Sequence, residues 1–524
     1  MKKNVFIALL VIVASLFPLH AGADVTVKEG FMASWDGTEI AYTMFLPDGA
    51  DAANPVPVVL RTHGWGGTRE RSAGGLVGKL LSAGYAVLTW DSRGFGNSGG
   101  QVEIDHPDWE GKDVSALIDF AAKQPEIEKR SSGKSPMPQA VLNRLPDRVK
   151  KRFGSAEADP VVGMSGGSYA GGIQLMSAAI DSRIDAIAPE IAWNDLPRSI
   201  FPNSVPKLGW DTLLYWSGQT ALTNGLPRGE TGNYNPEIHR SYFQVSATND
   251  PSPFVEFFDA RSPKHYIDSI TAPTFVIQGT IDTLFTVTEG VNNFLQVGDN
   301  TGADGTQVPV KLMLYNSGHT IGSSVPSGNA RATADTAIIS WFDRYLKEQE
   351  TDTGPLVEYQ DNLGSWYSAD SWPVGDELTI TGTASNLVVT PAPSGGGDIV
   401  KGNPNSKETS ARIPVLTADS DGTQIVGVPR LSGEATGLGE GAFLFFKLVD
   451  AETNQVLSDQ VTALSVELLN GPEAFDIQLE GVSWSLPAGH DLVLEISTGS
   501  MMYSNYRAAA LVNLDLELSV PVID

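Results

Sequence analysis

The feature that most constrains the fold is a change in the pattern of apolar residues after Lys347. Before that residue, short apolar segments alternate with segments whose apolar residues have helical spacing. The expected strands are 56–60, 86–90, 161–165, 184–188, 274–277 and 308–315, after a hairpin at 31–46. This alternation is typical of βαβ units, which build a mostly parallel sheet covered by helices. We therefore expect an α/β domain over residues 24–347.

After a polar linker at 348–355, the remaining sequence reads as strand after strand with turn signals between them. The strands are expected at 378–381, 424–428, 442–449, 460–468, 476–479, 491–497 and 512–518. Many short strands without helices indicate a sandwich or jelly roll. Residues 356–524 are therefore predicted to form a C-terminal all-β jelly-roll domain.

Two segments interrupt the α/β pattern. Residues 123–158 are rich in lysine and arginine, lack strand pattern, and are expected to form a surface insertion with no assigned role. Residues 195–270 mix aromatic residues and proline without a clear period. Because this second segment lies between two expected core strands, it is predicted to form a helical cap over a site.

The N-terminus has the pattern of a secretory signal. Lysines at positions 2 and 3 precede an apolar run at 5–17, and Ala21-Gly22-Ala23 supplies small residues for cleavage. This run of thirteen residues is shorter than the roughly 20 that a spanning helix needs. We expect residues 1–23 to be removed, leaving a periplasmic or extracellular protein without membrane insertion.

Composition excludes several functional classes. The chain has 524 residues and no cysteine, so it cannot use disulfides, thiolate metal sites or a cysteine nucleophile. Its net charge of −27 would repel a phosphate backbone, so nucleic acid is not an expected partner. No metal site is predicted, and the sequence leaves the oligomeric state open.

The segment 161–174, VVGMSGGSYAGGIQ, contains two serines in glycine-rich surroundings. In α/β enzymes a nucleophilic serine sits on a tight turn between strand and helix, flanked by small residues. Placing Ser165 there would shorten the strand and fill the start of the helix with glycines, each costing about 1 kcal/mol relative to alanine. Ser168 allows a full strand and is the predicted nucleophile.

The remaining members of a triad follow from position. Of seven histidines, only His319 directly follows one of the later core strands. Asp282 follows the preceding strand, so the order Ser168, Asp282, His319 is that of an α/β hydrolase. The backbone N–H of Tyr169 is expected to bind the oxyanion, with a second donor from the backbone or indole N–H of Trp65.

These motifs resemble the cocaine-esterase and Xaa-Pro dipeptidyl-peptidase type hydrolases, the CocE/NonD family. The resembling segments are 163–171, 89–99, 279–282, 318–319, 427–433 and 486–490. The resemblance implies an α/β-hydrolase sheet with a jelly roll, hydrolysis of esters or of peptide bonds after proline, and no cofactor. It also implies Ser168 as nucleophile with Asp282 and His319, although the family often has tyrosine where this chain has Trp65.

The substrate class stays open between a small ester and a short Xaa-Pro peptide. A dipeptidyl peptidase must bind an α-ammonium group, for which Glu190 and Asp195 are candidate carboxylates. An esterase needs only an apolar pocket, to which Trp193, Trp210 and Trp216 could contribute. The alternatives are an acyltransferase, or a non-catalytic protein on a hydrolase scaffold that binds peptide or glycan.

Overall fold

The structure is a computed structural model that describes residues 25–130, 159–223, 233–302, 305–319, 328–391, 398–404 and 410–523. The predicted signal segment and most of the predicted insertion at 123–158 lie outside these ranges. Among the described residues, no helix is both long enough and apolar enough to cross a membrane.

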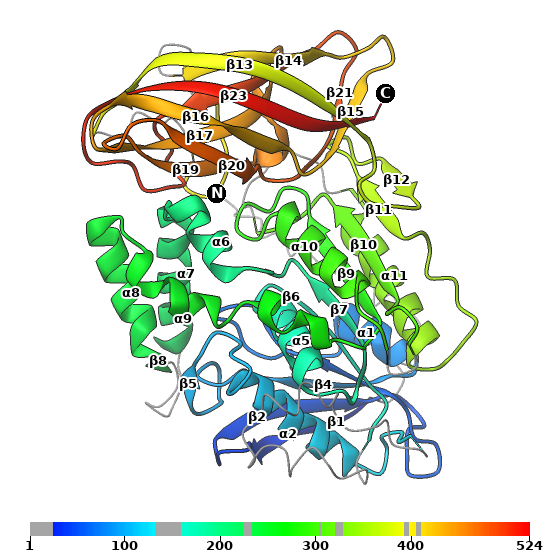
Figure 1. Ribbon diagram of the computed structural model, residues 1–524. Coiled ribbons are helices and arrows are strands. Elements are labelled where there is room, and N and C mark those ends of the chain that lie inside the picture. Colours follow the sequence, from blue (N-terminus) through cyan, green and yellow to red (C-terminus); the bar gives the residue numbers. More distant parts are fainter. Residues whose placement is uncertain are drawn as a thin grey trace, which may run out of the picture.

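A ten-stranded sheet forms the centre of the α/β domain (Figure 1). Its spatial order is β1 (Thr26–Ala33), β2 (Glu39–Leu46), β4 (Ala86–Trp90), β3 (Val58–Arg61), β6 (Val162–Gly167), β7 (Ile184–Glu190), β9 (Thr274–Gly279), β10 (Val310–Tyr315), β11 (Val357–Gln360) and β12 (Trp366–Ala369). The strands from β4 to β11 are parallel, and the outer pairs are antiparallel. The predicted hairpin is confirmed as β1 and β2.

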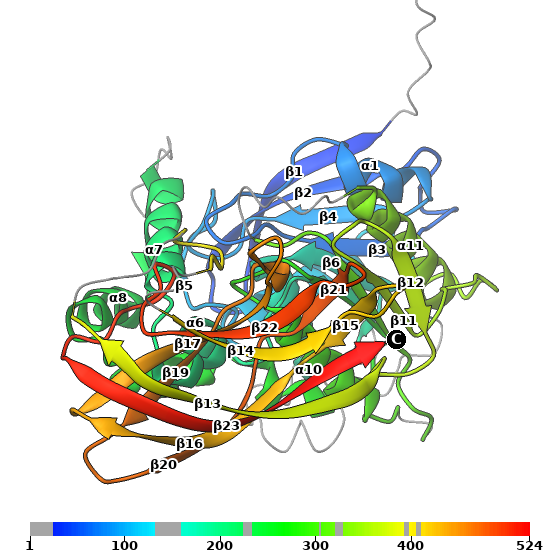
Figure 2. The same ribbon diagram turned by 90° about the horizontal axis from the view of Figure 1, so that it is seen from above.

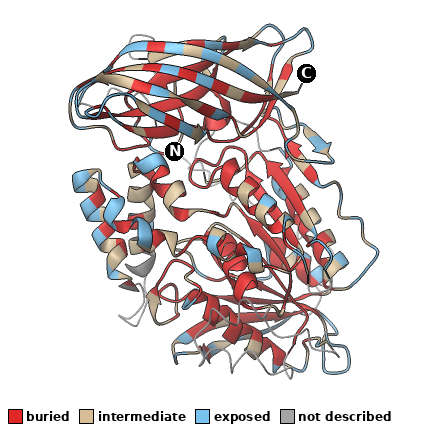
Figure 3. Ribbon diagram, viewed as in Figure 1, coloured by how far each residue is buried: buried red, intermediate tan, exposed pale blue. Residues whose placement is uncertain are grey.

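Helices cover both faces of this sheet, as expected for strands with nearly continuous apolar sequence. One face packs against α1 (Gly75–Ser82) and α11 (Ala330–Tyr345), and the other against α2 (Glu110–Ala122) and α5 (Tyr169–Ile180). A further helix, α10 (Val287–Gly298), contributes apolar side chains to two clusters. The central strands and the inner helix faces are consequently buried (Figure 3).

The α/β sheet extends further along the chain than the sequence suggested. Strand β11 pairs in parallel with β10, and β12 pairs with β11, so both belong to the large sheet. The expected boundary at residue 356 therefore falls before two strands of the α/β domain. The sequence pattern did not predict this extension of the sheet, because edge strands that follow the last core helix look like the strands of a following β domain.

The C-terminal domain is a sandwich of two antiparallel sheets (Figures 1 and 2). One contains β20 (Glu473–Gln478), β16 (Arg430–Leu438), β23 (Ala510–Ile523), β15 (Thr423–Gly427), β21 (Val482–Leu486) and β13 (Asp376–Val389). The other contains β14 (Ser410–Thr417), β22 (Asp491–Ser497), β17 (Gly441–Asp450), β18 (Gln455–Val456) and β19 (Thr462–Glu467). Their inner faces share one apolar core, as the alternating strand pattern requires.

Helices occupy the predicted cap region. They are α6 (Leu196–Ile200), α7 (Leu208–Thr223), α8 (Pro236–Thr248) and α9 (Val255–Asp259), with short 3₁₀ turns at 202–204, 252–254, 263–265 and 267–269. A two-stranded pairing of β5 (Gln101–Val102) with β8 (Asn233–Tyr234) ties the cap to the α/β domain. The β domain contains a 3₁₀ turn at 457–459. Its Phe443, Phe445 and Tyr503 pack in one apolar cluster with aromatic residues of the cap.

Candidate active site

Ser168 occupies the tight turn between β6 and α5. Its backbone has φ 60° and ψ −124°, a conformation that non-glycine residues rarely adopt and that often marks functional sites. The turn is crowded: a Cβ at Gly171 would lie 2.6 Å from the carbonyl oxygen of Glu190, and one at Gly172 would overlap the ring of Trp193. Glycines at these positions therefore let α5 start directly behind the serine.

Ser165 lies in a different environment. It is a buried residue inside β6, and its hydroxyl accepts a hydrogen bond of 2.6 Å from Nη1 of Arg61. Ser168 is only half-buried and lines a pocket. Of the two serines, Ser168 alone has the strand-to-helix turn geometry of a nucleophilic serine.

Asp282 and His319 are joined directly. Nδ1 of His319 lies 2.6 Å from Oδ2 of Asp282. The same carboxylate accepts backbone N–H groups from Leu284, Phe285 and His319 at 3.0–3.2 Å. Because a carboxylate only accepts, Nδ1 carries the proton and Nε2 is left with a free lone pair.

Nε2 of His319 is buried and has no hydrogen-bond partner within the described part of the chain. No hydrogen bond joins it to Ser168 among those residues. The two side chains are linked through Phe285, whose ring meets the imidazole edge-on at a centroid distance of 5.3 Å and lines the same pocket as Ser168. The arrangement thus brings the acid and the base together beside the pocket that holds the serine.

The N–H of Tyr169 is available for an oxyanion, because the first N–H groups of a helix have no partner within it. The loop after β3 also reaches the serine, since a Cβ at Gly64 would lie 3.7 Å from that of Ser168. The indole N–H of Trp65, however, donates to the carbonyl of Leu214 at 2.8 Å. This corrects the indole alternative: of the two Trp65 donors considered, the backbone N–H remains.

The neighbouring histidine of that loop has a structural role. Burial lowers the pKa of His63, so its imidazole is neutral. Nδ1 lies 2.8 Å from the carbonyl oxygen of Gly64, and Nε2 accepts the N–H of Ser92 at 3.1 Å. Both ring nitrogens are therefore used to hold the loop, in agreement with the elimination of this histidine as the base.

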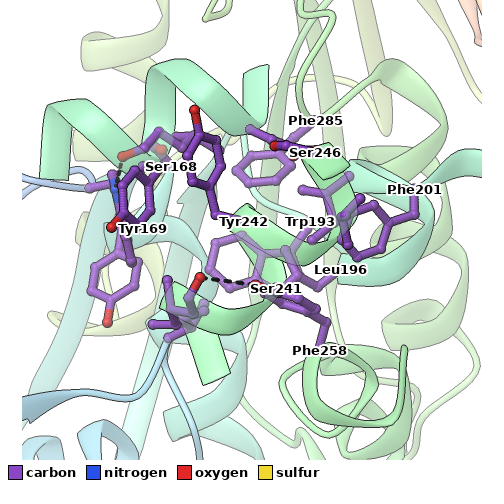
Figure 4. Close-up of a pocket in the computed structure, with 18 residues that line it drawn as sticks. Ser168, Tyr169, Trp193, Leu196, Phe201, Ser241, Tyr242, Ser246, Phe258 and Phe285 are labelled. Atoms are coloured by element: carbon purple, nitrogen blue, oxygen red, sulfur yellow. Dashed lines mark hydrogen bonds between the residues drawn. The ribbon is translucent and has the colours of Figure 1, made fainter. Parts of the chain in front are cut away.

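A pocket with almost entirely apolar walls lies beside Ser168 (Figure 4). It is lined by Trp65, Ile104, Ser168, Tyr169, Trp193, Leu196, Ile200, Phe201, Asp211, Leu214, Tyr215, Ile238, Ser241, Tyr242, Val245, Ser246, Phe258 and Phe285. Most of these residues come from the cap, so the cap supplies the binding surface. Of the three tryptophans proposed from the sequence, Trp193 lines the pocket and Trp210 packs edge-on against the His319 ring, whereas Trp216 is exposed.

Among the described residues of this lining, Asp211 is the only charged one. Its carboxylate forms no hydrogen bond or ion pair with any residue that the structure describes, and burial raises its pKa well above the ordinary value. Asp211 is not among the site residues predicted from the sequence. The available signal was a lone acidic residue within the otherwise uncharged stretch LGWDTLL of α7.

The two carboxylates that were selected lie elsewhere. Glu190 is buried at the end of β7, where its Oε1 accepts hydrogen bonds from the Tyr315 hydroxyl and the Arg331 guanidinium. Asp195 caps α6 and pairs with Lys264 at 2.7 Å. Neither lines the pocket of Ser168, and both are already engaged. Their expected role in binding an ammonium group is therefore corrected.

The fold and the site together define an α/β hydrolase with a helical cap and a C-terminal β domain. Within that class, the chain belongs to the X-Pro dipeptidyl-peptidase (S15) family, whose model matches residues 36–321. This confirms the family resemblance predicted from the motifs.

Solved structures with the same fold cover nearly the whole chain. An α-amino acid ester hydrolase is 16% identical, with a TM-score of 0.69 and coverage of 99% of this chain and 98% of that one. A CocE/NonD family hydrolase from Staphylococcus aureus is 15% identical, with a TM-score of 0.65 and coverage of 95% and 94%.

Curated relatives match over shorter regions. An uncharacterised 31.7 kDa protein of Escherichia coli is 26% identical over 156 residues, which are 30% of this chain and 43% of that protein. An uncharacterised protein of Pseudomonas aeruginosa is 25% identical over 172 residues, 33% and 38% of the two chains. The chain thus matches less than half the length of each of these relatives.

Proposed function

We propose that this protein is a serine hydrolase that cleaves an ester or an Xaa-Pro peptide bond through an acyl-enzyme. The observation that carries the proposal is the Asp282–His319 pair. Nε2 of His319 has no partner among the described residues, and the imidazole contacts Phe285, which lines the pocket that holds Ser168. The family match and the ester-hydrolase fold support the same reaction class.

In the proposed reaction, Nε2 of His319 takes the proton of the Ser168 hydroxyl while Oγ bonds to the substrate carbonyl carbon. The N–H of Tyr169 stabilises the resulting oxyanion, a contribution that is typically worth 10²–10³ in rate. The imidazolium then protonates the departing alcohol or amine as its bond to carbon breaks. Water repeats the sequence to release the acid, and Asp282 holds the imidazole in one tautomer throughout.

The pocket favours an acyl group that combines apolar surface with a cationic amine. Its walls are mainly aromatic and aliphatic, and Asp211 places among them a carboxylate that has no partner in the described part of the chain. Burial disfavours the charged carboxylate, and an ammonium group beside it would restore that charge. Aminoacyl esters and N-terminal Xaa-Pro peptides both carry such an ammonium on the acyl side of the cleaved bond. Asp211 is therefore compatible with an ester substrate and with a peptide substrate.

Labelling with a fluorophosphonate probe tests the catalytic proposal. We expect the wild type to be labelled, Ser168→Ala to lose labelling, and Ser165→Ala to keep it if it folds. A folded wild type that is not labelled would instead favour a non-catalytic binding protein. For a labelled wild type, product analysis with an added amine or alcohol separates hydrolysis from acyl transfer. A hydrolase transfers the acyl group mainly to water, and an acyltransferase transfers it mainly to the added acceptor.

A substrate panel tests the leaving group. It compares Ala-Pro and Gly-Pro anilides with short and long acyl esters, each with a free amine and in N-acetylated form. Turnover of proline anilides alone would overturn the esterase reading, and turnover of esters alone would overturn the peptidase reading.

We also propose that the protein is exported after removal of residues 1–23, because those residues have the three regions of a secretory signal. N-terminal sequencing of protein recovered from the periplasm and the medium tests this. An intact Met1 on protein confined to the cytoplasm would contradict it.

A further inference from the structure

The loop that carries Asp282 is held by the β domain. Gln460, which follows the 3₁₀ turn at 457–459, donates from Nε2 to the carbonyl of Asp282 at 2.9 Å and to that of Thr280 at 3.3 Å. Gln460 is only 5% exposed, so these hydrogen bonds are shielded from water. A side chain from the second domain therefore satisfies the backbone on both sides of Ile281.

Ile281 itself is part of the β-domain core. It is 6% exposed and packs in the apolar cluster formed otherwise by residues between 384 and 520. Its neighbours contact the α/β domain: the Thr280 hydroxyl donates to Asn316 at 2.7 Å, and Asp282 pairs with His319. Successive side chains of this loop thus alternate between the two domains.

The next residue of the loop completes the attachment. Thr283 donates its hydroxyl proton to the carbonyl of Val400 and accepts the indole N–H of Trp210 at 3.0 Å. The buried ammonium of Lys207 donates to the carbonyls of Thr283 and Leu284 at 2.9 and 3.2 Å. The α/β domain, the cap and the β domain all hold this one loop.

We infer that the β domain is a working part of the active site and that Gln460 is a positioning residue for Asp282. This inference rests on the proposed function, because it assigns Asp282 to the triad. A loop with unsatisfied backbone carbonyls opens locally at low cost, whereas catalysis needs the acid and base held within a fraction of an ångström. Gln460 supplies that restraint without contacting substrate.

The test compares Gln460→Met with Gln478→Met, the same substitution at an exposed position of the same domain. Methionine keeps the length of the side chain but removes the donor. The Oε1 atom of Gln460 is buried without a partner among the described residues, so its loss should limit the cost to folding. We therefore expect Gln460→Met to fold, with a modestly lower Tm.

For Gln460→Met we expect kcat to fall about 10- to 100-fold, as small misplacements of reacting groups do, while KM stays within about twofold. The fluorophosphonate labelling rate should fall by the same factor. The acid limb of the kcat/KM profile should move to lower pH, because a weaker Asp282 contact stabilises the imidazolium less. Gln478→Met should match the wild type in all three measurements.

Active-site titration distinguishes positioning from folding. If Gln460→Met has fewer active sites but each turns over at the wild-type rate with an unchanged pH profile, the residue is only structural and the inference is wrong. It is equally overturned if a fully folded variant keeps the wild-type kcat. Failure of the wild type itself to react would instead refute the proposed function.

Discussion

Gly318 lies against Asp282 so closely that a Cβ at residue 318 would be 2.6 Å from the Cβ of Asp282. Its φ of 145° also falls in the region that favours glycine. The residue before the proposed base therefore has no room for a side chain, because the acid fills the space.

We expect Gly318→Ala to displace His319 from Asp282 and to lower kcat/KM by about 10- to 100-fold. Strain of about 1–3 kcal/mol should also lower the free energy of unfolding. Steady-state kinetics and thermal melts measure the two effects. Gly74→Ala is the control, since its φ is −98° and a Cβ there meets only Ser72 Oγ at 3.8 Å. Wild-type kcat/KM in Gly318→Ala would contradict the close-packing argument.

The contact of Trp65 with Leu214 predicts a small effect for Trp65→Phe. The indole N–H is engaged by the cap, so removing it should change kcat by less than about threefold while loosening α7. Loss of an oxyanion donor would cost 10²–10³ in kcat. Kinetics on one ester substrate, together with a melt, therefore decide whether the indole acts on the oxyanion.

Asp211→Asn should discriminate between substrates. Hydrogen bonds to charged groups are worth about 1.5–3 kcal/mol, so kcat/KM for free-amine substrates should fall about 10- to 150-fold. N-acetylated counterparts should be affected by less than about threefold. Because burial raises the pKa of Asp211, wild-type preference for the free amine should also weaken as pH falls and the carboxyl is protonated. Equal losses for both substrate forms would rule out ammonium recognition by Asp211.

Glu190→Gln, in contrast to Asp211→Asn, is predicted to lower stability and to leave the preference for free-amine substrates unchanged. Its carboxylate pairs with Arg331, whose side chain is half exposed, so the stability loss should be about 1 kcal/mol after screening by water. The ratio of kcat/KM between free-amine and acetylated substrates should stay at the wild-type value. A lowered ratio would restore the ammonium-binding role that the sequence suggested.

Glu110 makes stability depend on pH. Burial raises its pKa to about 8, against roughly 4.3 in an unfolded chain. Between these values the folded state holds a proton that the unfolded state has released. The stability that Glu110 contributes to the folded state is fully present below the unfolded pKa. It is lost as pH rises through about 8, at up to about 1.4 kcal/mol per pH unit.

Glu110→Gln should remove this dependence and keep an acceptor for the hydroxyl of Tyr169, which donates to Oε1 of Glu110 at 3.2 Å. Urea unfolding at pH 6, 7 and 8 measures the free energy of unfolding. As pH rises, this free energy should increase for the variant relative to the wild type by about 1 kcal/mol per pH unit. The exposed Glu434→Gln should show no such trend. Parallel pH curves for Glu110→Gln and wild type would mean that Glu110 is ionised throughout.

The sequence by itself determined the order of the α/β strands as far as β10, the turn at Ser168 and the succession of Ser168, Asp282 and His319. These depend on local periodicity, on where small residues fit, and on the rule that parallel strands end at one edge of a sheet. The strands and the turn are each encoded within a few neighbouring residues, and the order of the three residues is visible along the chain, so all of these can be read without the fold.

Only the tertiary structure decided which polar groups are free. Trp65 meets Leu214, Glu190 meets Arg331 and Gln460 meets Asp282, across separations of 141 to 178 positions. The stretch around Asp211 marks the residue as a lone acid, but it does not show that the carboxylate lacks a partner among the described residues. A polar side chain becomes a binding group only when the partners that would satisfy it are absent, and packing between distant segments determines which partners are present.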